Sequence, residues 1–115
     1  MNFSNPILIY SNNEQFRFHI RDILMKNGFF HILESASETE TKNYIGYKKD
    51  YIVLIDSNIL DSSLHEVLKT QKNYIVFSNK NEDITAKLAA QIGTEKILCY
   101  PIHSRKLLEK INNLP

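Results

Sequence analysis

Apolar and polar residues follow two different periods along this chain. Five short, nearly continuous apolar runs are separated by segments in which apolar residues recur three or four positions apart. The runs are typical of strands buried on both faces of a sheet, and the spaced pattern is typical of amphipathic helices. The predicted strands are PILIY (6–10), FFHILES (29–35), YIVLID (51–56), NYIVFS (73–78) and KILCY (96–100).

Helices are predicted between the strands and after the last one. Asn12 or Asn13 is expected to cap the first helix, and Gly28 to end it in a left-handed conformation. Gly93 is expected to end the helix before the last strand. The apolar face of the first helix consists of Phe16, Ile20, Ile23 and Leu24. The later helices are expected to begin at polar caps, namely Ser37, Ser63, Asp83 and Ser104.

Strand and helix alternate five times through short connections. This order predicts an α/β fold with a five-stranded parallel sheet that is doubly wound, flavodoxin-like, and covered by helices on both faces. We expect residues 7–10 and 53–55 to form adjacent parallel strands. With 115 residues, the chain is expected to form a single domain over positions 1–115.

Composition excludes several functional classes. The chain is 43% hydrophobic and 23% charged with a net charge of +1, so no basic excess favours nucleic acid as a partner. The single cysteine, Cys99, cannot form an internal disulfide, is expected in the core, and agrees with a reducing cytosol. Because the first residues show neither a charged leader nor a long apolar run, we expect a cytoplasmic protein with no signal peptide and no membrane contact.

The chemistry of the chain is expected just beyond the strand ends. In open α/β sheets, ligands bind outside the carboxyl ends of the strands. Asp56 comes directly at the end of the third predicted strand and is expected to face hydroxyls and amides, without a second carboxylate or a lysine. Its expected neighbours are Ser11, Asn12 and Asn13 after the first strand, Ser78 and Asn79 after the fourth, and Tyr100 and Pro101 after the fifth.

These positions make the whole chain resemble the receiver domain of two-component response regulators. The resemblance is carried by ILIYSNNEQFR, YIVLIDSNIL, IVFSN and KILCYPI. It implies that Asp56 holds the position phosphorylated by a histidine kinase, and that Ser78 is the switch hydroxyl. It also implies that Asn58 holds the position whose backbone carbonyl helps to bind Mg²⁺ in the family. Pro101 holds the position of a proline that often follows a cis peptide bond.

The departures from the family pattern concern its charged groups. The acidic pair that holds Mg²⁺ falls on Ser11 and Asn12, and the lysine that pairs with the phosphoryl group falls on Tyr100. The aromatic switch position falls on Ile97, and the proline after the phosphoacceptor falls on Leu60. Since Mg²⁺ normally takes one or two carboxylates, its binding is expected to be weak or absent and no other cofactor is expected. The resemblance is therefore to a degenerate receiver.

Two hypotheses follow from the resemblance. In the first, the domain is a pseudo-receiver that a partner reads without phosphorylation. In the second, Asp56 is still a phosphoacceptor, although Asp56 at a strand end can also simply cap a turn. The expected partner is a histidine kinase, a phosphotransfer protein or an output domain of a bacterial phosphorelay, with a homodimer also possible. By family analogy, the contact face is made by the fourth helix, fifth strand and fifth helix.

Enzymatic activity is not expected. Gly28, Gly46 and Gly93 form neither a dinucleotide fingerprint nor a phosphate loop, and the strand ends supply no Ser/His/Asp set. Tyr100 is expected either to face a partner or to pack beside the sheet with its hydroxyl outward. The histidines lack metal-ligand spacing, namely His19, His31, His65 and His103.

Overall fold

The computed structural model describes residues 5–46, 50–56, 73–78, 90 and 92–114. Its elements are β1 (Ile7–Tyr10), α1 (Glu14–Lys26), β2 (Ile32–Ser35), α2 (Glu38–Gly46), β3 (Ile52–Asp56), β4 (Asn73–Ser78), the 3₁₀ turn η2 (Thr94–Lys96), β5 (Ile97–Cys99) and α5 (Ser104–Asn112). The predictions made for Asn58, Leu60, Ser63, His65, Asn79 and Asp83 lie outside the described residues.

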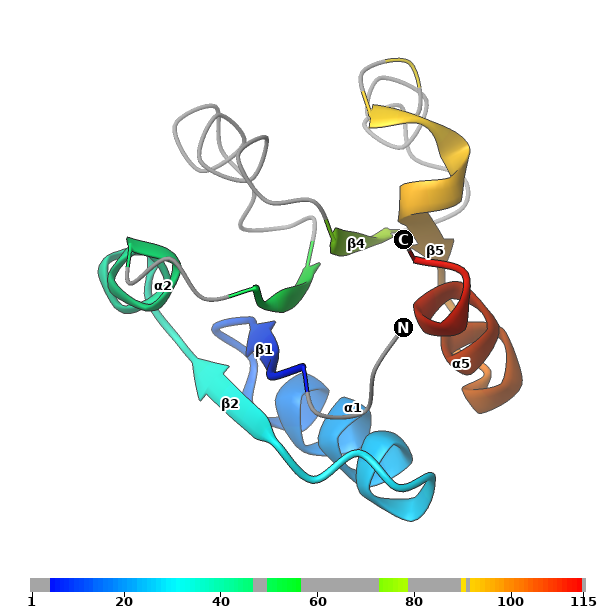
Figure 1. The fold of residues 1–115 in the computed structure, drawn as a ribbon, viewed down its shortest axis with the longest axis horizontal. Helices are drawn as coiled ribbons and strands as arrows, with labels where there is room; N and C mark the ends of the chain where they lie inside the picture. The colour runs from blue at the N-terminus through cyan, green and yellow to red at the C-terminus, as the bar shows by residue number, and fades with distance from the viewer. Residues whose placement is uncertain (1–4, 47–49, 57–72, 79–89, 91, 115) are drawn as a thin grey trace.

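The strands form one parallel sheet in the order β2-β1-β3-β4-β5 (Figure 1). β1 lies between β2 and β3, with Leu8 paired to both Leu33 and Val53. The predicted adjacency of residues 7–10 and 53–55 is therefore confirmed. β3 is central and buried over its whole length, as its continuous apolar run predicts.

Helices cover both faces of the sheet, as predicted (Figure 1). Alternate strand residues point to opposite faces, so the core divides into two clusters. On the α1/α5 face, Ile9 and Leu54 pack with Leu24 of α1 and Leu107 of α5. On the α2 face, the cluster contains Leu8, Tyr10, Val53, Val76 and Ile97 together with Ile45 of α2.

Local hydrogen bonds explain where the helices begin and end. The Asn13 side-chain oxygen accepts from the N–H groups of Gln15 and Phe16 at 2.9 and 3.2 Å, so Asn13 rather than Asn12 caps α1. Gly28 follows the end of α1 with a φ of +90°, a conformation that glycine adopts without strain. The Ser37 hydroxyl accepts from the Glu40 N–H at 3.1 Å, which confirms the predicted cap of α2.

Several boundaries differ from the sequence prediction. β2 starts at Ile32 rather than at position 29, because the Phe29 N–H still bonds to the Leu24 carbonyl at the end of α1. β5 starts at Ile97, because the preceding residue belongs to η2. The predicted cap Ser104 is wrong by one position: Ser104 is already helical, and His103 is the N-cap without a side-chain hydrogen bond.

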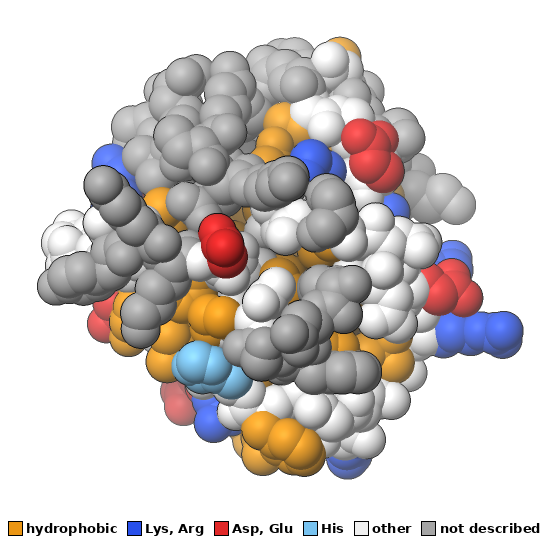
Figure 2. Space-filling model, viewed as in Figure 1, with side chains coloured by type: hydrophobic (Ala, Val, Ile, Leu, Met, Phe, Trp, Pro, Cys, Tyr) orange, Lys and Arg blue, Asp and Glu red, His pale blue; other side chains and the backbone are white. Residues whose placement is uncertain are grey.

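The surface carries charges of both signs. On the face shown in Figure 2, the coloured Lys, Arg, Asp and Glu side chains are spread out and do not gather into a patch of one sign. Three large hydrophobic side chains are exposed, namely Phe18, Met25 and Phe30. Within the described part of the chain, no helix is long and apolar enough to cross a membrane.

Candidate functional site

Asp56 ends the central strand and carries a buried carboxylate. Its residue is only 5% exposed, and its register partner on β4 is Phe77. Because side chains alternate along β3, Asp56 points to the same face as Ile52 and Leu54, the face covered by α1 and α5. A buried carboxylate needs hydrogen-bond donors, so its neighbours determine what the site can do.

Ser11 supplies the first of these donors. It follows β1 directly, is fully buried, and its hydroxyl donates to the Asp56 carboxylate at 3.4 Å. The same hydroxyl oxygen accepts from the Asn13 N–H at 3.0 Å. Ser11 therefore links the start of α1 to the end of β3, and the prediction that Asp56 meets a hydroxyl from the first strand end is confirmed.

Tyr100 follows β5 directly and so lies beyond β4 from Asp56. Burial, the negative charge of Asp56 and a hydrogen bond with its side chain together raise the pKa of Tyr100 well above its ordinary value. The phenol is therefore neutral at ordinary pH. The Tyr100 ring is half-buried and packs against the core cluster on the α1/α5 face, so the expectation that it packs beside the sheet is confirmed.

Phe16 fixes the ring of Tyr100 in place. The two rings meet edge to face with centroids 6.3 Å apart, and Phe16 also meets Phe77 edge to face at 5.3 Å. Such pairs contribute about 0.5–1.5 kcal/mol beyond their burial. The helical pattern correctly placed Phe16 on the inner face of α1, but no sequence signal indicated that it would contact Tyr100, which lies far along the chain.

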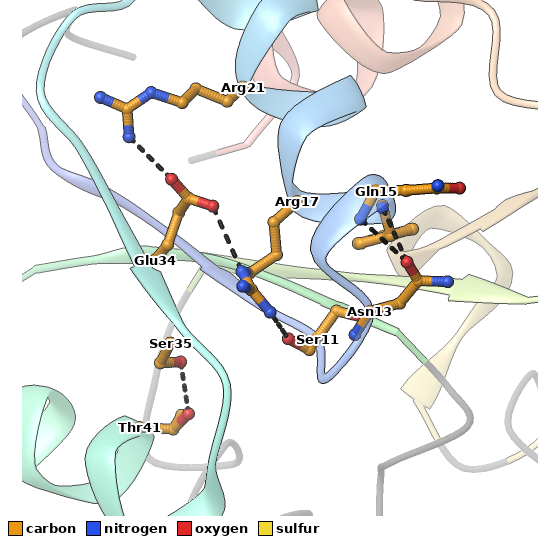
Figure 3. A network of polar contacts seen from close by, with 9 residues as sticks. Ser11, Asn13, Gln15, Arg17, Arg21, Glu34, Ser35 and Thr41 are labelled. Atoms are coloured by element: carbon orange, nitrogen blue, oxygen red, sulfur yellow. Dashed lines mark hydrogen bonds and ion pairs between the residues drawn. The ribbon is translucent and has the colours of Figure 1, made fainter.

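A second polar network, which does not include Asp56, stabilises the turn between β1 and α1 (Figure 3). It is formed by Arg17, Arg21 and Glu34. Arg17 donates to the Ser11 backbone carbonyl at 2.7 Å and to Glu34 of β2 at 3.2 Å. Arg21 donates to the other oxygen of Glu34 at 3.0 Å. Sequence reasoning missed this network, because nothing in the pattern indicates which charged pair across two elements will meet.

The other predicted positions divide between the two faces of the sheet. Ser78 is fully buried at the end of β4, and its carbonyl accepts from the Tyr100 N–H at 2.9 Å. Ile97 is buried in the cluster on the α2 face, away from Asp56. Asn12 is exposed beside Ser11, and Pro101 is exposed after a cis peptide bond with Tyr100, as the resemblance implied.

Among the described residues, the donor set around Asp56 does not fit Mg²⁺. This cation takes an octahedral set of oxygens that usually includes one or two protein carboxylates besides substrate oxygens and waters. Here the buried carboxylate accepts from the neutral hydroxyl of Ser11, and Glu14 lies instead in a groove with Arg17 and Glu34. Among the described residues, no group of three or more His, Cys, Asp or Glu side chains is placed to hold a metal ion.

Neither a family model nor a curated protein matches this chain, but several solved structures do. A receiver domain protein from Clostridium thermocellum is 22% identical, with a TM-score of 0.73 over 96% of this chain and 93% of that chain. A putative pilus assembly-related protein from Burkholderia pseudomallei is 15% identical, with a TM-score of 0.74 over 99% and 91%.

A third similar structure comes from a signalling complex. It is the Saccharomyces cerevisiae co-crystal of the histidine phosphotransfer protein Ypd1 with the receiver domain of its downstream response regulator Ssk1. The match is 14% identical, with a TM-score of 0.73 over 96% of this chain and 88% of that chain. Receiver domains recur among these structures, and the strand order and both helical layers agree with a flavodoxin-like sheet. The chain therefore has the fold of a response regulator receiver domain.

Proposed function

We propose that this protein is an atypical receiver domain of two-component signalling that binds its partner without being phosphorylated. The observation that carries the proposal is the surroundings of Asp56. The positions of the acidic pair and the lysine of active receivers are held by Ser11, Asn12 and Tyr100, none of which is charged, and Ser11 donates its hydroxyl to the carboxylate. In this role the domain has no catalytic activity of its own.

Charge explains why these replacements favour an unphosphorylated domain. A phosphoryl group carries about −1.5 to −2 charges at neutral pH, which the site would have to neutralise. Opposite unit charges ~4 Å apart attract by ~4 kcal/mol at an effective dielectric of ~20, and hydroxyls offer no such attraction. If desolvation cancels most of this attraction, the ~1.4 kcal/mol that is left per lost charge still changes an equilibrium constant by a factor of ten. Phosphorylated Asp56 is therefore poorly stabilised.

The proposed partner is another signalling protein. The yeast receiver domain in the similar structure was crystallised with a phosphotransfer protein. By analogy, a histidine kinase, a phosphotransfer protein or an output domain is the partner proposed here, inside the cell and without nucleic acid or membrane. A partner that binds one fixed conformation is expected to bind equally well with or without modification of Asp56. A ligand shifts a conformational equilibrium only when its affinity differs between the two conformations.

Incubation with a small phosphodonor and Mg²⁺ tests this function. The unmodified protein is expected to show no mass gain of one phosphoryl group, since neither the metal nor the phosphoryl charge finds a countercharge. Intact-protein mass spectrometry measures the outcome, and Asp56→Asn serves as the control for phosphorylation elsewhere. Stoichiometric modification that disappears in Asp56→Asn would contradict the proposal.

A specific observation favours the second function, that of a genuine phosphoacceptor. Asp56 and Ser78 both stand at the positions that the resemblance assigns to the phosphoacceptor and the switch hydroxyl, at the ends of adjacent strands. The phosphodonor experiment decides between the two functions, because only a phosphoacceptor gains mass at Asp56.

Metal binding gives an independent prediction. The unmodified protein is expected to show no saturable Mg²⁺ binding at low millimolar concentration, whereas Ser11→Asp combined with Asn12→Asp is expected to restore it, because each carboxylate adds a negative ligand. A Mg²⁺ titration followed by residue-resolved NMR measures both. Saturable shifts around Asp56 in the unmodified protein would show that the site is not degenerate.

A further inference from the structure

Helix α1 carries apolar side chains on two opposite sides. Its inner side covers one face of the sheet (Figure 1) and buries Ile20, Ile23 and Leu24 in the core. On the outer side, Phe18 is 70% exposed and Met25 is 43% exposed. Positions seven apart on a helix return to within ~20° of the same direction, so these two side chains point away from the sheet together. The fold itself does not need them there.

Opposite charges lie between the two exposed apolar residues. Arg21 is one turn after Phe18, and Asp22 is one turn before Met25. Their side chains are 39% and 45% exposed. Adjacent residues on a helix do not face each other, so these two charges do not neutralise each other within α1. The outer side of the helix thus presents an apolar residue at each end and one charge of each sign at its centre.

We propose that this outer side of α1 binds the same surface of a second copy of the chain, with the two helices antiparallel. We call the surface the α1 stripe, namely Phe18, Arg21, Asp22 and Met25. A two-fold axis between positions 21 and 22 gives an isologous contact, in which each pair of residues occurs twice. Phe18 of each copy then lies against Met25 of the other copy. At the centre, Arg21 of each copy lies against Asp22 of the other.

Charge complementarity makes a second copy the fitting occupant of the stripe. If the two helices ran parallel and in register, Arg21 would face Arg21 and Asp22 would face Asp22, and like charges repel. In the antiparallel arrangement, both central contacts join opposite charges. At both ends, the thioether of Met25 meets the ring of Phe18, which is a favourable pair. The stripe is therefore complementary to itself in one orientation.

The central charges can bind across the dimer and keep their partners within the chain. Arg21 donates to Glu34 at 3.0 Å through one terminal nitrogen, and a guanidinium carries five N–H donors. Asp22 binds Lys26 at 3.0 Å through one carboxylate oxygen, and a carboxylate has two. The contact with Glu34 also limits the motion of the Arg21 side chain, so less conformational entropy is lost on association.

The size of the stripe limits the affinity. With 13 residues, α1 is ~20 Å long, so a contact of one helix per copy belongs to the small interfaces that bury less than ~1,200 Å² in total. We therefore expect a dissociation constant on the order of 100 μM, with the monomer prevailing at low micromolar concentration. The interaction does not depend on the state of Asp56.

Sedimentation velocity of the full chain tests the dimer. Over concentrations from about a tenth to about ten times the expected dissociation constant, the sedimentation coefficient is expected to rise from the monomer value towards the dimer value. Phe18→Ser is expected to raise the dissociation constant at least about tenfold, because the two-fold axis makes it remove two contacts. Phe30→Ser is the matched control: Phe30 is 72% exposed but lies beyond the end of α1, so no change is expected.

Charge exchange tests the antiparallel register. Arg21→Asp brings carboxylates against each other at both central contacts, and Asp22→Arg does the same with guanidinium groups. Each variant alone is expected to raise the dissociation constant at least about tenfold. An equal mixture of the two variants is expected to associate again as a heterodimer, since both contacts then join opposite charges. Because Arg21→Asp also loses the contact with Glu34, circular dichroism checks that both variants are folded.

Every outcome of these measurements bears on the α1 stripe. A protein that stays monomeric at the highest concentration overturns the proposal and leaves the stripe to a different partner protein. Equal losses in Phe18→Ser and Phe30→Ser would show non-specific hydrophobic association, and a mixture of the charge variants that fails to associate would rule out this register. Phosphorylation of Asp56 in the unmodified protein would contradict the proposed function but leave the dimer unaffected, so the two failures are distinguishable.

Discussion

Phe77→Ala is expected to lower the free energy of unfolding by about 3–5 kcal/mol, the usual cost of truncating a buried aromatic residue. Phe77 is fully buried in β4, pairs in register with Asp56, and supports the Phe16 ring at 5.3 Å. The truncation leaves a cavity between α1 and the sheet and also removes an edge-to-face ring contact. Equilibrium unfolding in urea, followed by circular dichroism, measures the change.

Phe18→Ala is the matched control for this substitution. Phe18 lies in α1 and is 70% exposed, so its truncation is expected to change the free energy of unfolding by no more than about 0.5 kcal/mol. Natural domains have a free energy of unfolding of only about 0.05–0.15 kcal/mol per residue. A loss of several kcal/mol in Phe77→Ala should therefore be clearly distinguishable from the small change in Phe18→Ala. Equal losses in Phe77→Ala and Phe18→Ala would contradict the placement of Phe77 in the core.

The sheet was predictable because its strands are continuous apolar runs. Residues 74–77 and 52–55 are continuous apolar or aromatic runs, so the alternatives for these segments were few. The boundaries were less predictable. Phe29 and Phe30 look alike in sequence, but Phe29 is buried beneath the end of α1 and Phe30 is 72% exposed. Which of two neighbouring aromatic residues enters the core depends on tertiary packing, which no local pattern encodes.

The site was predictable in its members but not in their roles. Strand ends placed Ser11, Asp56 and Tyr100 together, because the carboxyl edges of parallel strands meet at one side of a sheet. The packing of the Tyr100 ring was not predictable, since it depends on Phe16, which lies on α1 and far away in the sequence. A tyrosine at a strand end can present its hydroxyl to solvent or to a buried carboxylate, and only the packing around its ring decides between them.

Restoring the charged groups of active receivers is expected to create a phosphorylatable site. The variant carrying Ser11→Asp, Asn12→Asp and Tyr100→Lys is expected to be phosphorylated on Asp56 by a small phosphodonor, in a reaction that requires Mg²⁺. Each restored charge is expected to add about 1.4 kcal/mol, or tenfold, so that the three together raise the rate by ~10³. Time-resolved intact-protein mass spectrometry measures the rate, and an added Asp56→Asn substitution should abolish it.

Single changes separate the two barriers in this variant. Tyr100→Phe removes the phenol hydroxyl without adding charge, and Ser11→Asp with Asn12→Asp adds the metal ligands while Tyr100 stays in place. If missing charge is the main barrier, the acidic pair alone gains Mg²⁺-dependent phosphorylation and Tyr100→Phe gains none. If Tyr100 itself is the main barrier, the variant with the acidic pair binds Mg²⁺ but remains unphosphorylated until Tyr100 is replaced. Phosphorylation of the unmodified protein at the rate of the triple variant would contradict both, because the hydroxyls around Asp56 would then suffice for the chemistry.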